Sequence, residues 1–295
     1  MHTPFPQSRR TPKRVLALSS LCAALAVALP AQAQVTLDVI GPHEYDLPVG
    51  FKPFNVFVQY ATFQNGSRAW DSRGDDRRAA EKTRTIVGMS KYVRFWTPES
   101  NPNIGLAYEV ILPEVGVSND ATNTSNSGLG DPLTGPAIWY KPTPNSTLGF
   151  QTFFQIPVGN KDVGGGDVWK NLSSLFWDVQ FQRFSYTADA GFVFFGESTA
   201  ADARPATVFH TNHRVGYKLS DAVQPFIALD YERQGSWTNR ATGVKVAASR
   251  ETTAGIGVMF SYYGNQSITV RYSRGVSGED HGMTNSFNLK YAYAW

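Results

Sequence analysis

The histidines are the first residues to consider for chemistry, because a histidine beside a serine can hydrolyse an ester and two histidines can hold a metal ion. His210 and His213 are close in sequence, but residues three apart in a strand point to opposite faces, so they cannot share a metal ion. Neither is followed two positions later by a serine, which would place both on one face. The sequence therefore predicts no catalytic residue, no metal site and no cofactor, and it disfavours a lipid hydrolase.

Charged side chains instead occupy alternate positions in segments whose other positions are apolar. Glu109, for example, lies between Tyr108 and Val110. If such strands cross a membrane, an Arg or Lys that faced lipid at the midplane would cost on the order of 2–4 kcal/mol, so these residues should face a watery lumen. The lumen-facing candidates are Glu109, Asp178, His210, Arg214, Asp230, Arg271 and Lys290.

The same alternation predicts three aromatic side chains on the lumen side. Phe57, Phe153 and Phe184 would either fill the lumen or form an apolar track along it. Lys91 does not fit its segment, because it shares a face with Met89 and Val93. We expect either a β-bulge there or the opposite assignment of the two faces.

Twelve segments have the period-2 pattern of strands. They are residues 52–63, 83–97, 103–116, 131–141, 147–158, 172–185, 188–197, 205–218, 223–234, 249–263, 266–275 and 284–295.

The connections between these segments alternate in length. Short turns fall at residues 145, 220–221 and 264–265, whereas every second connection is long and polar. The long connections are residues 64–82, 118–130, 159–171, 197–204, 235–248 and 276–283. Bacterial outer-membrane barrels have short periplasmic turns and longer extracellular loops. The pattern predicts an all-β fold, a transmembrane antiparallel up-and-down β-barrel of about 12 strands with a narrow lumen.

The last strand has the form with which such barrels end. Phe287, Leu289, Tyr291, Tyr293 and Trp295 alternate with small or polar residues, up to the final residue. A C-terminal strand that ends on an aromatic residue suits recognition by the barrel-assembly machinery, so we expect that partner to bind the strand that ends at Trp295.

The first 33 residues have the pattern of a secretory signal peptide. A basic stretch precedes a short apolar run, and Ala31-Gln32-Ala33 has the small-x-small form of a cleavage site. Cys22, the only cysteine, would leave with this peptide, so the mature chain would have no disulfide and no thiolate. Loss of four basic residues changes the formal charge from +3 to about −1, which gives no electrostatic case for nucleic-acid binding.

The chain thus divides into a signal peptide (1–33), an N-terminal segment (34–51) and a barrel (52–295). The N-terminal segment has no clear amphipathic period. It would either plug the lumen or lie in the periplasm, and the sequence leaves both open. The predicted location is the bacterial outer membrane.

Several motifs resemble those of a known family. They are Leu-Pro-Val-Gly-Phe at 47–51, Gly-Leu-Gly-Asp-Pro at 128–132, Ile-Pro-Val-Gly-Asn-Lys-Asp at 156–162 and the glycine-rich 164–167. They are similar to those of the outer-membrane proteins named for the meta-pathway (MetA-pathway) of phenol degradation, over about residues 47–295. The resemblance implies a barrel that passes small, often aromatic, compounds used as carbon sources, and no catalytic residues.

Two function classes follow. The first is an outer-membrane channel or facilitated transporter for small organic, including aromatic, compounds linked to catabolism. The alternative is a closed structural or surface-interaction barrel. An outer-membrane lipid hydrolase is a less favoured alternative. The expected partners are a small organic solute, outer-membrane lipid and lipopolysaccharide, and no nucleic acid. The sequence leaves open the substrate, the oligomeric state, and whether solute leaves axially or through the wall.

Overall fold

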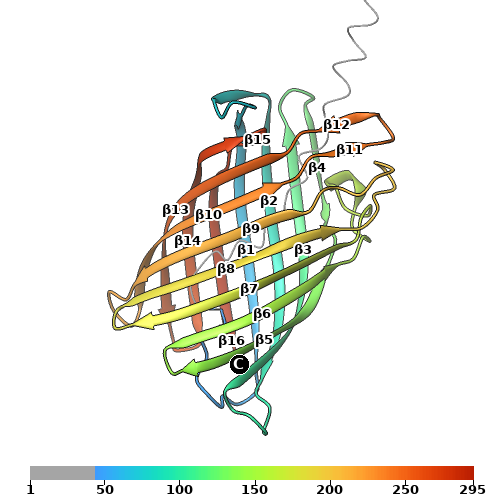
Figure 1. Ribbon diagram of the computed structural model, residues 1–295. Helices are drawn as coiled ribbons and strands as arrows, with labels where there is room; N and C mark the ends of the chain where they lie inside the picture. Colours follow the sequence, from blue (N-terminus) through green and yellow to red (C-terminus); the bar gives the residue numbers. More distant parts are fainter. Residues whose placement is uncertain (1–43) are drawn as a thin grey trace, which may run out of the picture. The chain divides into compact units, whose positions relative to one another are not determined.

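The alternating segments form a barrel in the computed structural model, which describes residues 44–295 (Figure 1). Among these residues, twelve strands make the wall. They are β1 (Phe54–Trp70), β2 (Asp76–Trp96), β3 (Ile104–Asn119), β5 (Leu133–Thr143), β6 (Ser146–Gln155), β7 (Lys170–Phe181), β8 (Phe184–Phe195), β9 (Val208–Tyr217), β10 (Val223–Gln234), β13 (Ser249–Tyr262), β14 (Gln266–Glu279) and β16 (Asn285–Ala294). The predicted signal peptide and its cleavage site lie outside the described residues.

The wall closes where the first strand meets the last. In β1, Val58 lies opposite Lys91 of β2 on one side and Ala292 of β16 on the other, and the pairing is antiparallel throughout. Closure removes free sheet edges and lets each strand's backbone hydrogen bonds be made by its neighbours, which a membrane interior requires. The predicted fold class, a 12-stranded antiparallel barrel, is confirmed.

Among residues 44–295, no helix is long and apolar enough to cross a membrane.

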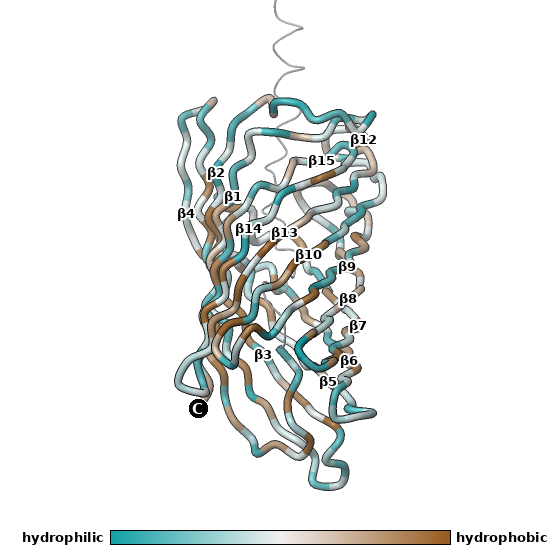
Figure 2. The backbone as a smooth tube through the Cα atoms, turned by 90° about the vertical axis from the view of Figure 1, so that its left-hand side faces the viewer, coloured by the Kyte–Doolittle hydropathy of each residue, from teal (hydrophilic) through white to brown (hydrophobic). Residues whose placement is uncertain are grey.

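The two ends of the barrel differ as the connection lengths predict. At one end β5 joins β6, and β7 joins β8, through two residues each. At the other end lie β4 (Thr124–Leu129), the 3-10 turn η1 (Lys161–Val163), β11 (Trp237–Asn239), β12 (Val244–Val246) and β15 (His281–Gly282). In bacterial outer-membrane barrels the short turns lie at the periplasmic end. Figure 2 shows mostly hydrophilic residues at the long-connection end.

The first long connection is shorter than predicted. Residues 64–82 are mostly strand, because β1 runs to Trp70 and β2 begins at Asp76. The alternating pattern of β1 and β2 continues towards the long-connection end, beyond the part of the wall that would face lipid. Polar side chains pair across the β1–β2 hairpin there as readily as apolar ones. Gly74, at φ 80°, allows the tight turn, and its N–H donates to Asp71 O at 3.0 Å.

Side chains of the wall alternate between a buried inner face and an exposed outer face. Glu109 is 0% exposed, whereas its neighbours Tyr108 and Val110 are 46% and 47% exposed. Two aromatic assignments were wrong: Phe57 and Phe184 lie on the outer face and are exposed. Phe57 pairs with the outward Tyr92 and Tyr293, and Phe184 belongs to the aromatic rim beside the short β7–β8 turn, where its ring lies 5.1 Å from that of Tyr217.

In β2 the side chain of Lys91 decides which face is inward. Lys91 is buried and inward, and so are Val93 and Phe95, with no register shift between β1 and β2 at this point. Of the two explanations for Lys91, the bulge is therefore wrong and the reversed faces are correct. The inner face of β2 is partly apolar here because Val93 and Phe95 pack in one cluster with Tyr45, which precedes β1 inside the barrel.

Candidate functional site

The described residues that precede β1 enter the barrel. We call residues 44–50 the plug segment. The carboxylate of Glu44 accepts from Lys290 Nζ of β16 at 2.6 Å and from Lys91 Nζ of β2 at 3.1 Å. The hydroxyl of Tyr60 donates to the same carboxylate at 2.7 Å. The sequence leaves open whether the N-terminal segment plugs the lumen or lies in the periplasm. Its described part lies inside the lumen, and residues 34–43 lie outside the described residues.

Tyr45 is the central side chain of the plug segment. Its hydroxyl lies 2.7 Å from Glu109 Oε1 and 2.8 Å from Gln151 Oε1. Its ring stacks on Phe176 with centroids 4.5 Å apart and lies 5.3 Å from Trp139. These rings belong to an apolar cluster inside the barrel that also contains Val93, Phe95, Ala107 and Ala137. The plug segment is thus held by aromatic packing as well as by charge.

Asp46 anchors the plug segment to a different part of the wall. Lys141 Nζ of β5 donates to its carboxylate at 2.6 Å, and Gln180 Nε2 of β7 at 3.1 Å. Leu47 and Phe51, which follow, pack against the aromatic cluster. Two acids flanking one aromatic residue therefore contact strands on several sides of the lumen.

The electrostatics favour a charged Glu44. Burial raises the pKa of its carboxyl, but the ammonium groups of Lys290 and Lys91 outweigh burial and hold the pKa well below its usual range. Lys91 also forms an ion pair with Glu109, at 2.7 Å. Buried charges of both signs are thus paired, and the plug segment supplies one of the partners.

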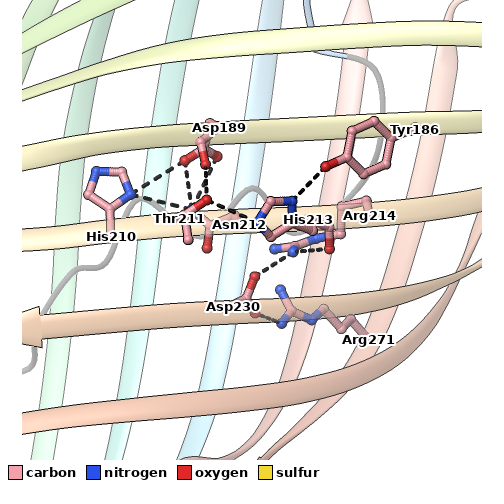
Figure 3. A network of polar contacts seen from close by, with 9 residues as sticks. All are labelled: Tyr186, Asp189, His210, Thr211, Asn212, His213, Arg214, Asp230 and Arg271. Carbon is pink, nitrogen blue, oxygen red and sulfur yellow. Dashed lines mark hydrogen bonds and ion pairs between the residues drawn. The ribbon is translucent and has the colours of Figure 1, made fainter.

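A second polar network lies on the inner wall formed by β8, β9, β10 and β14 (Figure 3). Asn212 donates to both oxygens of Asp189, at 2.8 and 3.1 Å, and His210 Nδ1 lies 3.4 Å from the same carboxylate. Asp230 forms ion pairs with Arg214 and with Arg271, each through a separate oxygen. Two guanidinium groups from different strands therefore share one carboxylate.

The predicted lumen residues belong to different groups. All seven polar candidates are buried: Glu109, Asp178, His210, Arg214, Asp230, Arg271 and Lys290. Glu109 and Lys290 contact the plug segment, four others form the second network, and Asp178 accepts from Thr187 Oγ1 at 2.8 Å. Phe153 is buried in an apolar cluster with Ile111, Leu133 and Leu172. The lumen thus has charged and apolar regions instead of one centre.

The two histidines named for possible chemistry lie on opposite faces. His210 faces the lumen and is buried, whereas His213 belongs to the outer face, where its ring nitrogens lie 2.7 Å from Tyr186 Oη and 3.1 Å from Thr211 Oγ1. This arrangement separates them as the strand spacing predicts.

Comparison with known proteins gives the family. The family model described as "Putative MetA-pathway of phenol degradation" matches residues 66–291. The chain belongs to this family. The resemblance found in the sequence is thereby confirmed. No curated protein matches the chain in sequence.

Solved structures show the same architecture. An outer membrane channel from Pseudomonas putida F1 matches with a TM-score of 0.72 and 16% identity, covering 86% of this chain and 99% of that chain. The β domain of the Bordetella autotransporter BrkA matches with a TM-score of 0.52 and 14% identity, over 83% and 100% of the two chains. At these identities the likeness establishes the fold.

Several residues of the interior were not among the predicted candidates. Lys91, Trp139, Lys141 and Asp189 are all buried and inward. The phase of the segments 131–141 and 188–197 is ambiguous in the sequence, which hid three of them. Glu44 and Asp46 carry a weak signal: two acids precede a strand whose inner neighbours include lysines, and buried lysines require counter-ions.

A histidine at the long-connection end provides a pH-dependent contact. His281 of β15 lies 2.6 Å from Glu232 and 3.7 Å from Glu251, and although burial lowers its pKa, these carboxylates raise it to about 9. Its contribution to stability is therefore complete below its ordinary pKa of about 6.5 and is lost as the pH rises through about 9. We expect the free energy of unfolding to fall by about 3 kcal/mol between pH 6 and pH 10, measured with urea.

The variant His281→Gln isolates this effect. The variant lacks the titrating group. Its free energy of unfolding should therefore not show this part of the decrease above pH 7. An identical pH profile for the variant and the unaltered protein would show that His281 is not the group responsible.

Proposed function

We propose that the protein is an outer-membrane channel for small organic compounds, including aromatic ones, and that the structure is its closed state. The observation that carries the proposal is a plug held by noncovalent contacts, namely Glu44, Tyr45 and Asp46 inside a closed 12-stranded wall. A barrel of this size lies between those filled by side chains and those with a wide aqueous channel. Movement of the plug segment would open a passage of small-molecule width.

The lumen wall suits solutes that are partly apolar. The buried cluster of Ile111, Leu133, Phe153 and Leu172 makes the inner wall apolar on β3, β5, β6 and β7. A passage opened beside it would have this apolar wall on one side and the charged side chains of β8, β9, β10 and β14 on the other. The family takes its name from phenol degradation, and the Pseudomonas putida protein is described as an outer membrane channel. The family description supports small aromatic compounds as the solute class, and the likeness to the Pseudomonas putida protein supports a channel.

The second candidate is a closed structural barrel, which one observation favours. The inward Glu109, Arg214 and Arg271 are at most 1% exposed, so the lumen is filled in this state. The two functions differ in whether a state with an open lumen is populated.

Entry of an aromatic dye into intact cells tests the proposal. N-phenylnaphthylamine fluoresces in membranes but is retarded by the lipopolysaccharide layer, so a channel for aromatic compounds should speed its entry. We expect cells that produce the protein to take up the dye several-fold faster than cells that produce an outer-membrane barrel of similar size with a filled lumen. Equal rates at equal surface amounts would refute the channel and favour the structural barrel.

A further inference from the structure

A cavity lies in the wall where the pairing of β1 with the end of the chain is interrupted. β1 pairs with β16 as far as Gln64 and with β15 from Ala69 onwards. Between these points residues 65–68 of β1 oppose only residues 283–285, so β1 carries one extra residue, as in a β-bulge. The cavity at this irregularity has a volume of about 130 Å³, and we call it the seam cavity.

Two guanidinium groups and two side-chain amides line the seam cavity. Its lining residues are Asn65, Ser67, Arg68, Arg274, Met283 and Asn285. Arg68 is half-exposed and donates through Nε to Asp76 Oδ1 at 2.6 Å, so its two terminal nitrogens remain for a ligand. Arg274 is exposed and forms no ion pair with any of residues 44–295. None of the six lining residues is acidic, so the lining is positively charged.

The seam cavity lies at the edge of the apolar band on the outer face of the wall. Four large side chains form one row across β14, β16, β1 and β2, each at least 43% exposed: Tyr272, Phe287, Phe63 and Ile86. Two residues nearer the long-connection end, the corresponding row is polar: Arg274, Asn285, Asn65 and Arg84. Such a change between neighbouring rows marks the edge of the hydrocarbon layer.

This edge belongs to the outer leaflet if the barrel has the usual orientation. β15, which pairs with β1 next to the seam cavity, lies at the end that carries the long connections (Figure 1). In bacterial outer-membrane barrels that end is extracellular. The lipid headgroups at this level are therefore those of lipopolysaccharide, whose lipid part carries phosphate groups next to its acyl chains.

The lining has the chemistry of a phosphate site. Guanidinium groups bind phosphate oxygens through paired, charge-assisted hydrogen bonds. The amides of Asn65 and Asn285 can donate to further oxygens. A single water molecule needs roughly 10–15 Å³ of such space, so a cavity of about 130 Å³ has room for a phosphate group.

We propose that Arg68 and Arg274 bind a phosphate group of lipopolysaccharide in the seam cavity. The acyl chains of the same lipid then lie against Phe63, Tyr272 and Phe287. Inorganic phosphate would use the cavity alone, whereas this lipid presents charge and apolar chains in the order of the two rows. The proposal rests on the outer-membrane location in the proposed function, but not on whether the lumen conducts. Because the lining comes from both ends of the barrel, bound lipid also joins β1 to β14 and β16 across the seam.

Titration of the mature, refolded protein in detergent with purified diphosphoryl lipid A, followed by native mass spectrometry, tests the site. We expect Arg68→Gln and Arg274→Gln each to weaken binding roughly tenfold to a hundredfold, the size of a lost hydrogen bond to a charged group. Arg183→Gln removes an equal charge from an exposed arginine in the β7–β8 turn, at the opposite end of the barrel, and should bind lipid A normally.

A variant that keeps both arginines gives an independent test. Asn285→Asp places a carboxylate in the seam cavity without changing its volume, and it retains an oxygen to accept from the hydroxyl of Tyr272. The added charge repels phosphate, so this variant should also bind diphosphoryl lipid A several-fold more weakly. Binding as tight as that of the unaltered protein would contradict a phosphate in the cavity.

Two further ligands separate the sources of phosphate. Dephosphorylated lipid A keeps the chains without the charge and should bind the unaltered protein and the arginine variants equally. Inorganic phosphate lacks the chains and should bind about tenfold or more weakly than diphosphoryl lipid A. Equal affinities for inorganic phosphate and diphosphoryl lipid A would assign the cavity to free phosphate and overturn the proposal.

The remaining outcomes separate the site from the channel. Equal binding of diphosphoryl lipid A by Arg68→Gln, Arg274→Gln and Arg183→Gln would overturn the site. Lipid binding that depends on the two arginines, without faster dye entry into cells, would refute the channel and leave the site intact. Faster dye entry without such binding would do the reverse.

Discussion

Deletion of residues 34–49 is expected to turn a closed barrel into an open pore. The deletion removes Glu44, Tyr45 and Asp46, which occupy the lumen and bond to strands on several sides of it. In planar bilayers we expect the mean conductance to rise by the order of tenfold, because a 12-stranded wall without its filling is wider than the filled 8-stranded barrels. A deletion variant that folds but conducts no more than the unaltered protein would show that the plug segment does not close the lumen.

A single substitution in the plug segment should open the barrel less completely than the deletion. Glu44→Gln keeps the volume of the side chain but removes the charge that Lys91 and Lys290 share. Loss of one partner from a buried ion pair costs about 3–5 kcal/mol, and 1.4 kcal/mol is a factor of ten in an equilibrium, so open events should become about a hundredfold or more frequent. Glu99→Gln, an exposed acid in the turn after β2, is the control and should leave the conductance unchanged.

Replacement of Lys91 by Met should be the most damaging single substitution in the wall. Glu109 is 0% exposed, and Lys91 Nζ lies 2.7 Å from its carboxylate. Without the ammonium group a buried carboxylate remains with hydrogen bonds alone, which costs about 3–5 kcal/mol. Urea unfolding of the refolded protein should show this loss as a lower midpoint.

Two comparisons separate the ion pair from the lysine itself. The double variant Lys91→Met, Glu109→Gln removes both charges and should recover much of the lost stability. Lys82→Met breaks an exposed ion pair with Asp120, 3.5 Å long at the long-connection end, and should cost less than about 1 kcal/mol. Equal losses for Lys82→Met and Lys91→Met would show that burial of the pair is irrelevant.

Strand number, closure and family could be predicted from the sequence because each depends on local pattern. Alternation separates Tyr108 from Glu109 in any strand that faces lipid on one side, and turn lengths order the strands into hairpins. The faces of β2 could not be assigned in this way. Its inner residues Val93 and Phe95 are apolar because they pack against the plug segment, so a pattern that assumes a watery lumen gives the wrong phase there.

Of the candidate site, only the inward direction of its charged side chains could be predicted from the sequence. Arg214, Asp230 and Arg271 were recognised one strand at a time, but which of them meet depends on strand register and tilt, which the sequence does not display. Phe57 and Phe184 were misplaced because aromatic residues occur on both faces, as rim or as core. The role of Glu44 depends on Lys290, 246 residues away, and no local pattern links the two.

The seam of the wall determines the order in which this protein can assemble. Asn55 and Trp295 exchange backbone hydrogen bonds at 2.9 and 3.0 Å. The first strand, β1, can therefore pair with β16 only after the last residues have been synthesised. Contacts between such distant residues form late because of the entropy of closing so long a loop. Lys290 belongs to that final strand, so Glu44 gains its second lysine only when the wall is complete. The contact between Glu44 and Lys290 is therefore expected to form last, after the wall has closed, whereas Lys91 and Lys141 can pair with the plug segment earlier.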